Sequence, residues 1–121
     1  MSTTGVHDRG TGGILCQRLL NRLTFTVPGG YSLRPWLHRL RGVRIGKGVW
    51  ISRWVYIDEL HPEVVSIGDN STIGLRSSVI THLYWGPRTR VSRAGPVVIE
   101  HDVFVGPHCL ILPGVTIGSG A

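Results

Sequence analysis

The chain has 121 residues and a formal net charge of +6, because 13 lysine and arginine residues outnumber seven acidic ones. This length allows one domain, and no apolar run reaches the roughly 18 residues that a membrane-spanning helix requires. The two cysteines are too few for a disulfide framework, and the polar N-terminus contains no signal-peptide core, so we expect a cytoplasmic protein.

The positive charge is concentrated in the N-terminal third. Residues 1–48 contain eight of the lysines and arginines and a single acid, Asp8, whereas the other residues contain five against six acids. A strongly basic chain raises the question of nucleic-acid binding. No motif for binding DNA or RNA accompanies the charge, and we therefore expect no nucleic-acid partner.

Residues 1–13 are predicted to be a disordered tail, and residues 14–42 a leader of two helices. Ser32 is placed to cap the second helix, and Pro35 falls in its first turn. The apolar residues of each helix follow helical spacing and share one face. They are Ile14, Leu15, Leu19, Leu20 and Leu23 in the first helix, and Leu33, Trp36, Leu37 and Leu40 in the second.

The leader allows two interpretations. In the first, the helices cap the domain that follows them. In the second, their arginines and apolar residues form a basic amphipathic surface that rests on an anionic membrane. We favour the first interpretation and keep peripheral membrane contact as the alternative.

Residues 43–121 carry a six-residue repeat of aliphatic residues. A period of six fits neither a helix nor an isolated alternating strand, but it fits short strands joined by corners, with like residues stacked from coil to coil. The predicted fold class is therefore an all-β solenoid, a parallel β-helix. The aliphatic positions are Ile45, Ile51 and Ile57, then Ile67, Ile73 and Val79, then Ile99, Val105, Ile111 and Ile117.

The sequence also predicts the environment of other positions in the repeat. Glycine after an aliphatic residue, as at Gly68 and Gly74, allows either a corner with positive φ or a close approach of the next coil. Trp50 and Trp54 fall between the repeat positions and are expected to face outward, against the leader or another subunit. Cys109 occupies a small-residue position, where a thiol packs as a small apolar group.

Residues 45–121 resemble the hexapeptide-repeat acyltransferases, especially the maltose, galactoside and polysaccharide O-acetyltransferases, most clearly in PVVIEHDVFVGPHCLILPGVTIGSGA at residues 96–121. The resemblance implies a left-handed β-helix with triangular coils. It also implies transfer of an acetyl group from acetyl-CoA to a sugar or glycan hydroxyl, without a metal, by a homotrimer with active sites between subunits. The family's helix continues beyond the position of Ala121, so we expect the β-helix of this chain to be incomplete at its C-terminus.

The repeat breaks after Val79 and resumes at Ile99, which predicts a loop insertion at about residues 83–97. The family places its catalytic base where a loop leaves a coil, and among the six histidines only His82 has that placement. The resemblance therefore implies that His82 is the general base, a role that suits imidazole because its pKa is about 6.5. The alternative is a polar corner residue without a role in catalysis.

The inserted loop contains aromatic and arginine side chains, which stack on sugar rings and bind hydroxyl or carboxylate groups. Tyr84, Trp85 and Arg88 are therefore the candidate acceptor-binding residues. A solvated basic loop without a binding role is the alternative.

The resemblance also implies a place for acetyl-CoA. Phe104 stands where the family has an aromatic residue beside the CoA arm, and Gly106 and Pro107 follow on the same edge. These three are the candidate cofactor-binding residues.

Two other functions stay open. One is a non-catalytic β-helix module, because the repeat specifies a fold rather than an activity. The other is a zinc enzyme of the carbonic anhydrase kind, with His82, His101 and His108 as ligands, since neutral imidazole binds zinc well. The spacing argues against zinc, because His101 and His108 are seven residues apart whereas the corresponding ligands of that branch lie closer in sequence.

Overall fold

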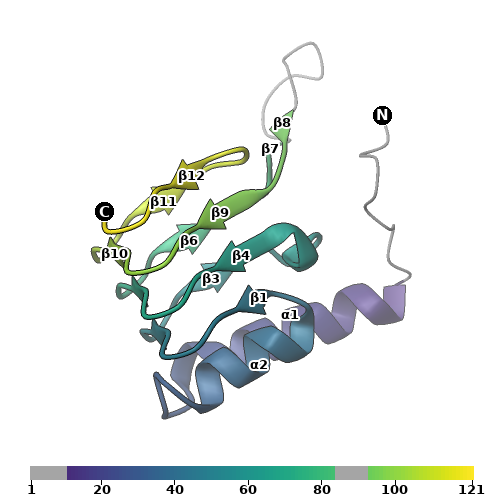
Figure 1. The fold of residues 1–121 in the computed structure, drawn as a ribbon. Coiled ribbons are helices and arrows are strands. Elements are labelled where there is room, and N and C mark those ends of the chain that lie inside the picture. Colours follow the sequence, from purple (N-terminus) through teal and green to yellow (C-terminus); the bar gives the residue numbers. More distant parts are fainter. Residues whose placement is uncertain (1–10, 84–92) are drawn as a thin grey trace.

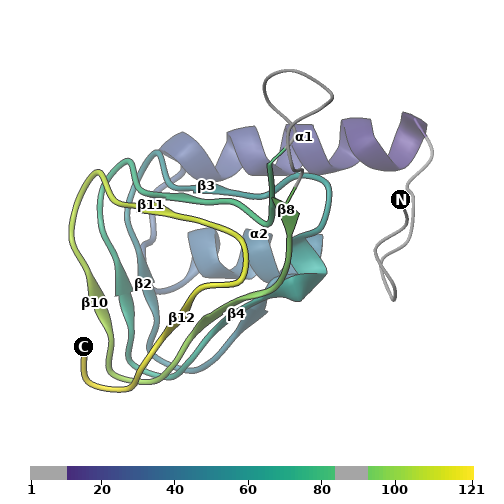
Figure 2. The ribbon, with the colours of Figure 1, turned by 90° about the horizontal axis from the view of Figure 1, so that it is seen from above.

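The computed structural model describes residues 11–83 and 93–121. Two helices, α1 (Thr11–Thr26) and α2 (Leu33–Arg41), precede a stack of short strands (Figure 1). Viewed along the stack, the chain winds in superimposed triangular coils (Figure 2). The strands are β1 (Arg44–Ile45), β2 (Trp50–Ile51), β3 (Tyr56–Ile57), β4 (Val65–Ile67), β5 (Thr72–Ile73), β6 (Ser78–Val79), β7 (His82–Leu83), β8 (Arg93–Ala94), β9 (Val97–Ile99), β10 (Phe104–Val105), β11 (Leu110–Ile111) and β12 (Thr116–Ile117), and a 3-10 turn (Pro62–Val64) precedes β4.

Each side of the triangle is a parallel sheet. The sheets are β1-β4-β9-β12, β2-β5-β10 and β3-β6-β11, and their register places the aliphatic residues of the repeat directly above one another. The stacked residues are Ile45, Ile67, Ile99 and Ile117 on the first side, Ile51, Ile73 and Val105 on the second, and Ile57, Val79 and Ile111 on the third. The predicted parallel β-helix is confirmed.

The interior of the coils is a continuous apolar core. Ile51, Ile57, Ile73 and Val79 are completely buried, and side chains of this size each contribute about 1.5–3 kcal/mol when they are fully buried. Because each ladder runs through successive coils, the same burial that stabilises one coil also fixes its register on the next.

Two buried serines join the second coil to the third. The hydroxyl of Ser71 donates to the carbonyl oxygen of Glu100 at 2.7 Å and accepts from the amide of Val103 at 3.1 Å. Ser77 makes the equivalent contacts with Gly106 and Cys109 one corner further on. The serines therefore pair backbone groups that a corner takes out of the strand ladders.

Gly68 and Gly74 serve close approach rather than positive φ. A Cβ atom on Gly68 would lie 2.6 Å from the carbonyl carbon of Glu100, and one on Gly74 would lie 2.5 Å from that of Gly106. The left-handed conformation falls two residues later, at Asn70 (φ 61°) and at the other corners. Glycine is needed here because the next coil lies directly on the backbone.

Cys109 departs from its predicted environment. It occupies the same corner position as the buried Ser77, yet its side chain is exposed. No further coil of the described chain covers this corner, and the thiol therefore lies at the open end of the stack.

The leader caps the first coil at the opposite end. α2 lies beneath the triangle and α1 packs beside it (Figures 1 and 2). α1 begins three residues before the predicted start at Ile14. Ser32 precedes α2 without a side-chain capping hydrogen bond, so the predicted cap is wrong, whereas Gly42 ends the helix with a φ of 112°. Among the described residues, neither helix is both long and apolar enough to cross a membrane.

Both tryptophans of the first coil contact the leader, as predicted. The ring of Trp50 meets Tyr31 edge to face at 4.9 Å, and the ring of Trp54 stacks on Phe25 at 5.4 Å. The amide of Trp54 also donates to the carbonyl oxygen of Phe25 at 3.1 Å. These contacts attach the leader to the side of the β-helix as well as to its end.

Candidate active site

His82 lies at the foot of the insertion. It begins a short antiparallel ribbon in which β7 pairs with β8, with His82 opposite Ala94, and the chain rejoins the stack in β9. The ribbon leaves the corner that follows β6, which is the position expected for His82. The candidate acceptor residues Tyr84, Trp85 and Arg88 lie outside the described residues, so their role stays a prediction.

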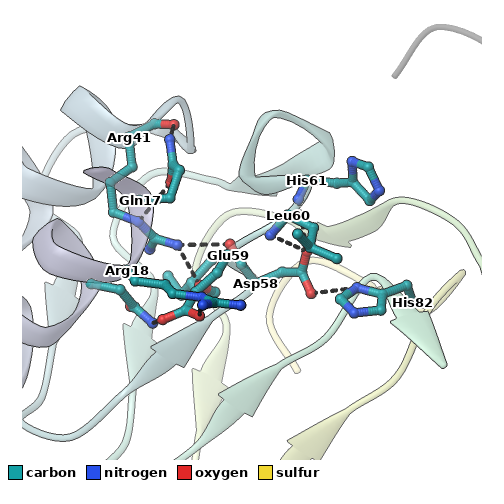
Figure 3. Close-up of polar contacts among 10 residues, drawn as sticks. Gln17, Arg18, Arg41, Asp58, Glu59, Leu60, His61 and His82 are labelled. Atoms are coloured by element: carbon teal, nitrogen blue, oxygen red, sulfur yellow. Dashed lines mark hydrogen bonds and ion pairs between the residues drawn. The ribbon is translucent and has the colours of Figure 1, made fainter. Parts of the chain in front are cut away.

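A buried aspartate holds His82. Nδ1 of His82 is 2.8 Å from Oδ1 of Asp58 (Figure 3), and the aspartate side chain is fully buried whereas 16% of the histidine side chain is exposed. The other carboxylate oxygen of Asp58 accepts hydrogen bonds from the amides of Leu60 at 3.2 Å and His61 at 2.8 Å. Backbone donors thus fix one oxygen of the carboxylate, and the other oxygen faces the imidazole.

Asp58 was not among the residues predicted from the sequence, although the repeat contained a signal for it. The first coil also breaks its repeat, between Ile57 and Ile67, at the same corner from which the longer insertion later leaves. Asp58 directly follows Ile57, and Ile57 stacks beneath Val79. Aligning the two breaks coil over coil would have placed Asp58 close to His82.

Residues of the leader form hydrogen bonds to the same corner. Arg41 of α2 is buried, and its Nη2 donates to the carbonyl oxygens of Ile57 at 2.6 Å and Asp58 at 2.7 Å. Its Nε donates to Gln17 of α1 at 3.1 Å, and its Nη1 lies 2.8 Å from Nδ1 of His38. Burial, with the neighbouring charge of Arg41, lowers the pKa of His38 to about 3. The ring is therefore neutral, and Nδ1 can accept from the guanidinium.

His61 lies beside the His82 side chain. The two rings are 6.1 Å apart and nearly perpendicular, and Nδ1 of His61 is 3.7 Å from a carboxylate oxygen of Glu63. Because His61 also gives its backbone amide to Asp58, it belongs to the wall of the site (Figure 3).

The candidate cofactor residues lie elsewhere on the coil. Phe104 begins β10 with its side chain 68% exposed. Phe104, Gly106 and Leu110 border a mainly apolar groove of about 390 Å³ at the open end of the stack, which is also lined by the ladder residues Val105, Ile111 and Ile117. Neither Pro107 nor His82 contributes to that groove. The β7–β8 ribbon leaves the corner of the triangle that faces the side formed by β2, β5 and β10 (Figure 2). Within one chain, the candidate donor residues and His82 are therefore not brought together.

The three histidines of the zinc alternative lie at three different corners. His82 follows β6, His101 lies between β9 and β10, and His108 lies between β10 and β11. His101 is exposed and its Nδ1 is 2.7 Å from Asp102, whose hydrogen bond raises the pKa of that histidine. In the described part of the chain no three histidine, cysteine or acidic residues are grouped to hold a metal ion.

Comparisons with known proteins agree with the repeat. The family model "Hexapeptide repeat of succinyl-transferase" matches residues 64–83 and 96–121. The "Putative acetyltransferase YvoF" of Bacillus subtilis (strain 168) is 36% identical over 92 residues, which are 74% of this chain and 51% of that protein. The Delta-poly-L-ornithine synthetase of Acinetobacter baumannii (strain AB307-0294) is 32% identical over 92 residues, 76% of this chain but 6% of that protein. The chain thus spans about half the length of the B. subtilis relative and only a small part of the A. baumannii relative.

Two solved structures show the same fold. A hexapeptide-repeat acetyltransferase of Vibrio cholerae, complexed with acetyl-CoA, superimposes with a TM-score of 0.69 at 22% identity and covers 90% of this chain and 71% of its own. A second structure of the V. cholerae acetyltransferase gives 0.67 at 21% identity, over 93% and 78% of the two chains. Their fold is the left-handed β-helix predicted above. With its stacked aliphatic ladders and these matches, the chain has the fold of the hexapeptide-repeat acyltransferases and is similar to them in sequence over its coils.

Proposed function

We propose that this chain transfers the acetyl group of acetyl-CoA to a hydroxyl group of a sugar or glycan, with His82 as the general base. The observation that carries the proposal is the contact between His82 and the buried carboxylate of Asp58. The name of the B. subtilis relative and the acetyl-CoA in the V. cholerae structure support the choice of acetyl donor.

The His82–Asp58 contact suits proton transfer. When Nδ1–H of His82 donates to Asp58, Nε2 carries the lone pair that accepts the proton of an attacking hydroxyl. The hydroxyl oxygen then forms a bond to the carbonyl carbon of the thioester, and Asp58 stabilises the imidazolium. The C–S bond breaks, the imidazolium returns its proton to the departing thiolate, and the products are CoA and the acetyl ester. No covalent enzyme intermediate is formed.

The separation of the two half-sites supports a homotrimer. Phe104 begins β10, which lies across the triangle from β8 of the ribbon that begins at His82 (Figure 2), so a neighbouring copy would supply Phe104, Gly106 and Pro107 beside each histidine. Tyr84, Trp85 and Arg88, which follow His82 in the sequence, are the proposed acceptor-binding residues of the same site. Closed rings of identical subunits form when one surface meets a different surface of the next copy.

Replacement of His82 tests the proposed base. We expect His82→Ala to lower turnover by about 10²- to 10⁴-fold, the usual effect of a general base. The assay measures CoA release from acetyl-CoA with a panel of sugar acceptors. The loss should be smaller with hydroxylamine, because this neutral nucleophile needs less help from a base.

The matched control is His61→Ala, which removes a neighbouring imidazole that does not contact the Asp58 carboxylate through its side chain. Its effect should be much smaller than that of His82→Ala. Unchanged turnover in His82→Ala would place the base elsewhere. Acetyl-CoA binding without any release of CoA in the unmodified protein would instead favour a non-catalytic module.

A further inference from the structure

We propose that the outward faces of α1 and α2 dock on the surface of an anionic lipid bilayer. This inference goes beyond acyl transfer and does not depend on it, because it rests on the leader alone.

Both leader helices direct their apolar stripes away from the coils. Leu15, Leu19 and Leu23 follow one another at four-residue intervals on α1, and their side chains are 44–61% exposed. An amphipathic helix of a globular domain normally turns such a stripe to the core. In α1 the buried positions are instead polar, among them Gln17 and Asn21.

α2 shows the same reversal for most of its predicted apolar face. Leu33, Trp36 and Leu40 form its outer stripe and are 37–58% exposed, whereas Arg34 and Arg41 are buried. Leu37 is the exception in this helix, because its side chain is buried. Adjacent apolar stripes on two packed helices form a surface patch of the kind that marks an interaction site.

Specific polar contacts hold the helices in this orientation. Arg34 donates from Nε to the carbonyl oxygen of Ile51 at 2.6 Å, and Gln17 donates from Nε2 to the carbonyl oxygen of Arg41 at 2.9 Å. Turning the apolar stripes inward would break these contacts and leave the carbonyl oxygens of Ile51 and Arg41 without these donors, which is costly where they are buried. The exposure of the stripes is therefore built into the leader.

The charge of the leader indicates an anionic partner. Residues 11–42 contain five arginines and no aspartate or glutamate. Arg18, Arg22 and Arg39 are exposed, and each lies three residues after a member of an apolar stripe, which makes it a neighbour on the helix surface. Apolar stripes bordered by arginine are typical of helices that lie in the interface of an anionic membrane.

The aromatic residues fit the same partner. Trp36 is exposed on the outer stripe of α2, and the exposed Tyr31 lies just before this helix. Tryptophan and tyrosine are enriched at the level of lipid headgroups, because one part of each ring is apolar and another is polar.

A second copy of the chain fits the leader less well. Arg18 is paired with Glu59 of the first coil at 3.7 Å. A symmetric dimer through this surface would bring the patch that contains Arg22 and Arg39 of one copy against the same patch of the other, and residues 11–42 provide no acid to balance them. Like charges facing each other across an interface are unfavourable. An anionic bilayer would instead attract these arginines.

Flotation of the 121-residue protein with lipid vesicles tests the proposal. We expect the protein to float with vesicles of phosphatidylcholine and phosphatidylglycerol, weakly with phosphatidylcholine alone, and less at high salt. Leu19→Glu and Trp36→Glu should each weaken binding by about tenfold or more, because a charge replaces an apolar contact. Arg22→Gln should weaken it by about fivefold.

Two matched controls make the same chemical changes on the second coil. Leu75→Glu alters an exposed leucine and Arg76→Gln an exposed arginine outside the leader, and both should bind vesicles like the unmodified protein. Failure to float with anionic vesicles, equal binding to neutral vesicles, or equal losses in the controls would each overturn the proposal. A change in molar mass by light scattering in Leu19→Glu, without a change in flotation, would assign the surface to contacts between copies and would also overturn it.

Discussion

At the level of single residues, the candidate site depends on how one buried carboxylate is satisfied. Asp58 is completely buried, and a carboxylate without hydrogen bonds in that position would be strongly destabilising. The amides of Leu60 and His61 satisfy one oxygen, and Nδ1 of His82 lies 2.8 Å from the other. The same contact that stabilises the buried Asp58 therefore orients the ring of His82.

Replacement of Asp58 tests this positioning role. We expect Asp58→Asn to lower kcat by about 10²- to 10⁴-fold, because the amide can no longer hold the reactive tautomer or stabilise the imidazolium. The KM for acetyl-CoA should change little, since Asp58 is buried away from the Phe104 groove. Steady-state kinetics on folded protein, verified by circular dichroism, measures both quantities.

Glu63→Gln is the matched control, because it makes the same chemical change at a carboxylate that lies near His61. It should retain kcat within a few-fold. A variant Asp58→Asn that keeps full kcat, or one in which only KM rises, would contradict the assignment of Asp58 as the residue that positions His82.

At the level of elements, the leader and the first coil share one polar network. Arg41 joins α2 to the carbonyl oxygens of Ile57 and Asp58. It also contacts Gln17 of α1 (Figure 3) and the neutral ring of His38. A buried guanidinium is tolerated only while its donors are satisfied. The network therefore depends on the protonation state of His38, which loses its acceptor when Nδ1 takes a proton.

This dependence predicts acid sensitivity. His38 has a pKa of about 3 in the folded protein, because of burial and of Arg41, against about 6.5 when unfolded. As the pH falls below 6.5, the unfolded state binds a proton that the folded state does not. The contribution of His38 therefore lowers the free energy of unfolding by up to about 1.4 kcal/mol per pH unit between these two values.

The measurement is denaturant unfolding at a series of pH values. His38→Asn keeps an oxygen that can accept from Arg41 but cannot titrate, so its free energy of unfolding should fall less steeply with acid than that of the unmodified protein. His108→Asn, at an exposed corner, should leave the slope unchanged. Equal slopes for the unmodified protein and His38→Asn would show that His38 does not cause the acid sensitivity.

The sequence predicted the β-helix more completely than it predicted the leader or the site, and the reason is physical. A six-residue period determines both which side chain is buried and which residue lies above it. The stacking of Ile73 on Ile51 could therefore be predicted from the sequence. A helical period shows only that an apolar stripe exists. The inward orientation of Arg34 and Arg41 depends on carbonyl oxygens of the first coil, and local sequence does not encode those partners. Asp58 and its partner His82 are distant in sequence, and only an alignment of the two breaks in the repeat brings them together.

At the level of the whole molecule, the two proposed half-sites face different directions. The ribbon that begins at His82 lies at one corner of the triangle, and the strand that begins at Phe104 lies on the side facing that corner (Figure 2). The stacked coils are joined by short corners and a continuous core, so one chain cannot bend to bring the two sides together. In the proposed site, a second copy would therefore present its Phe104 side chain to His82 of the first.

Mixed oligomers test this arrangement. We expect His82→Ala and Phe104→Asp to be inactive when each is prepared alone, and to recover activity when the two are coexpressed. In a random mixture each site has one chance in two of an intact His82 and one in two of an intact Phe104, so about one quarter of the unmodified activity should return if these come from different subunits of a ring.

A coexpressed pair of His82→Ala and Asp58→Asn should recover nothing, because these residues act within one chain. Recovery by the second pair, or none by the first in an assembled oligomer, would show that the donor groove and the base do not meet across a subunit interface.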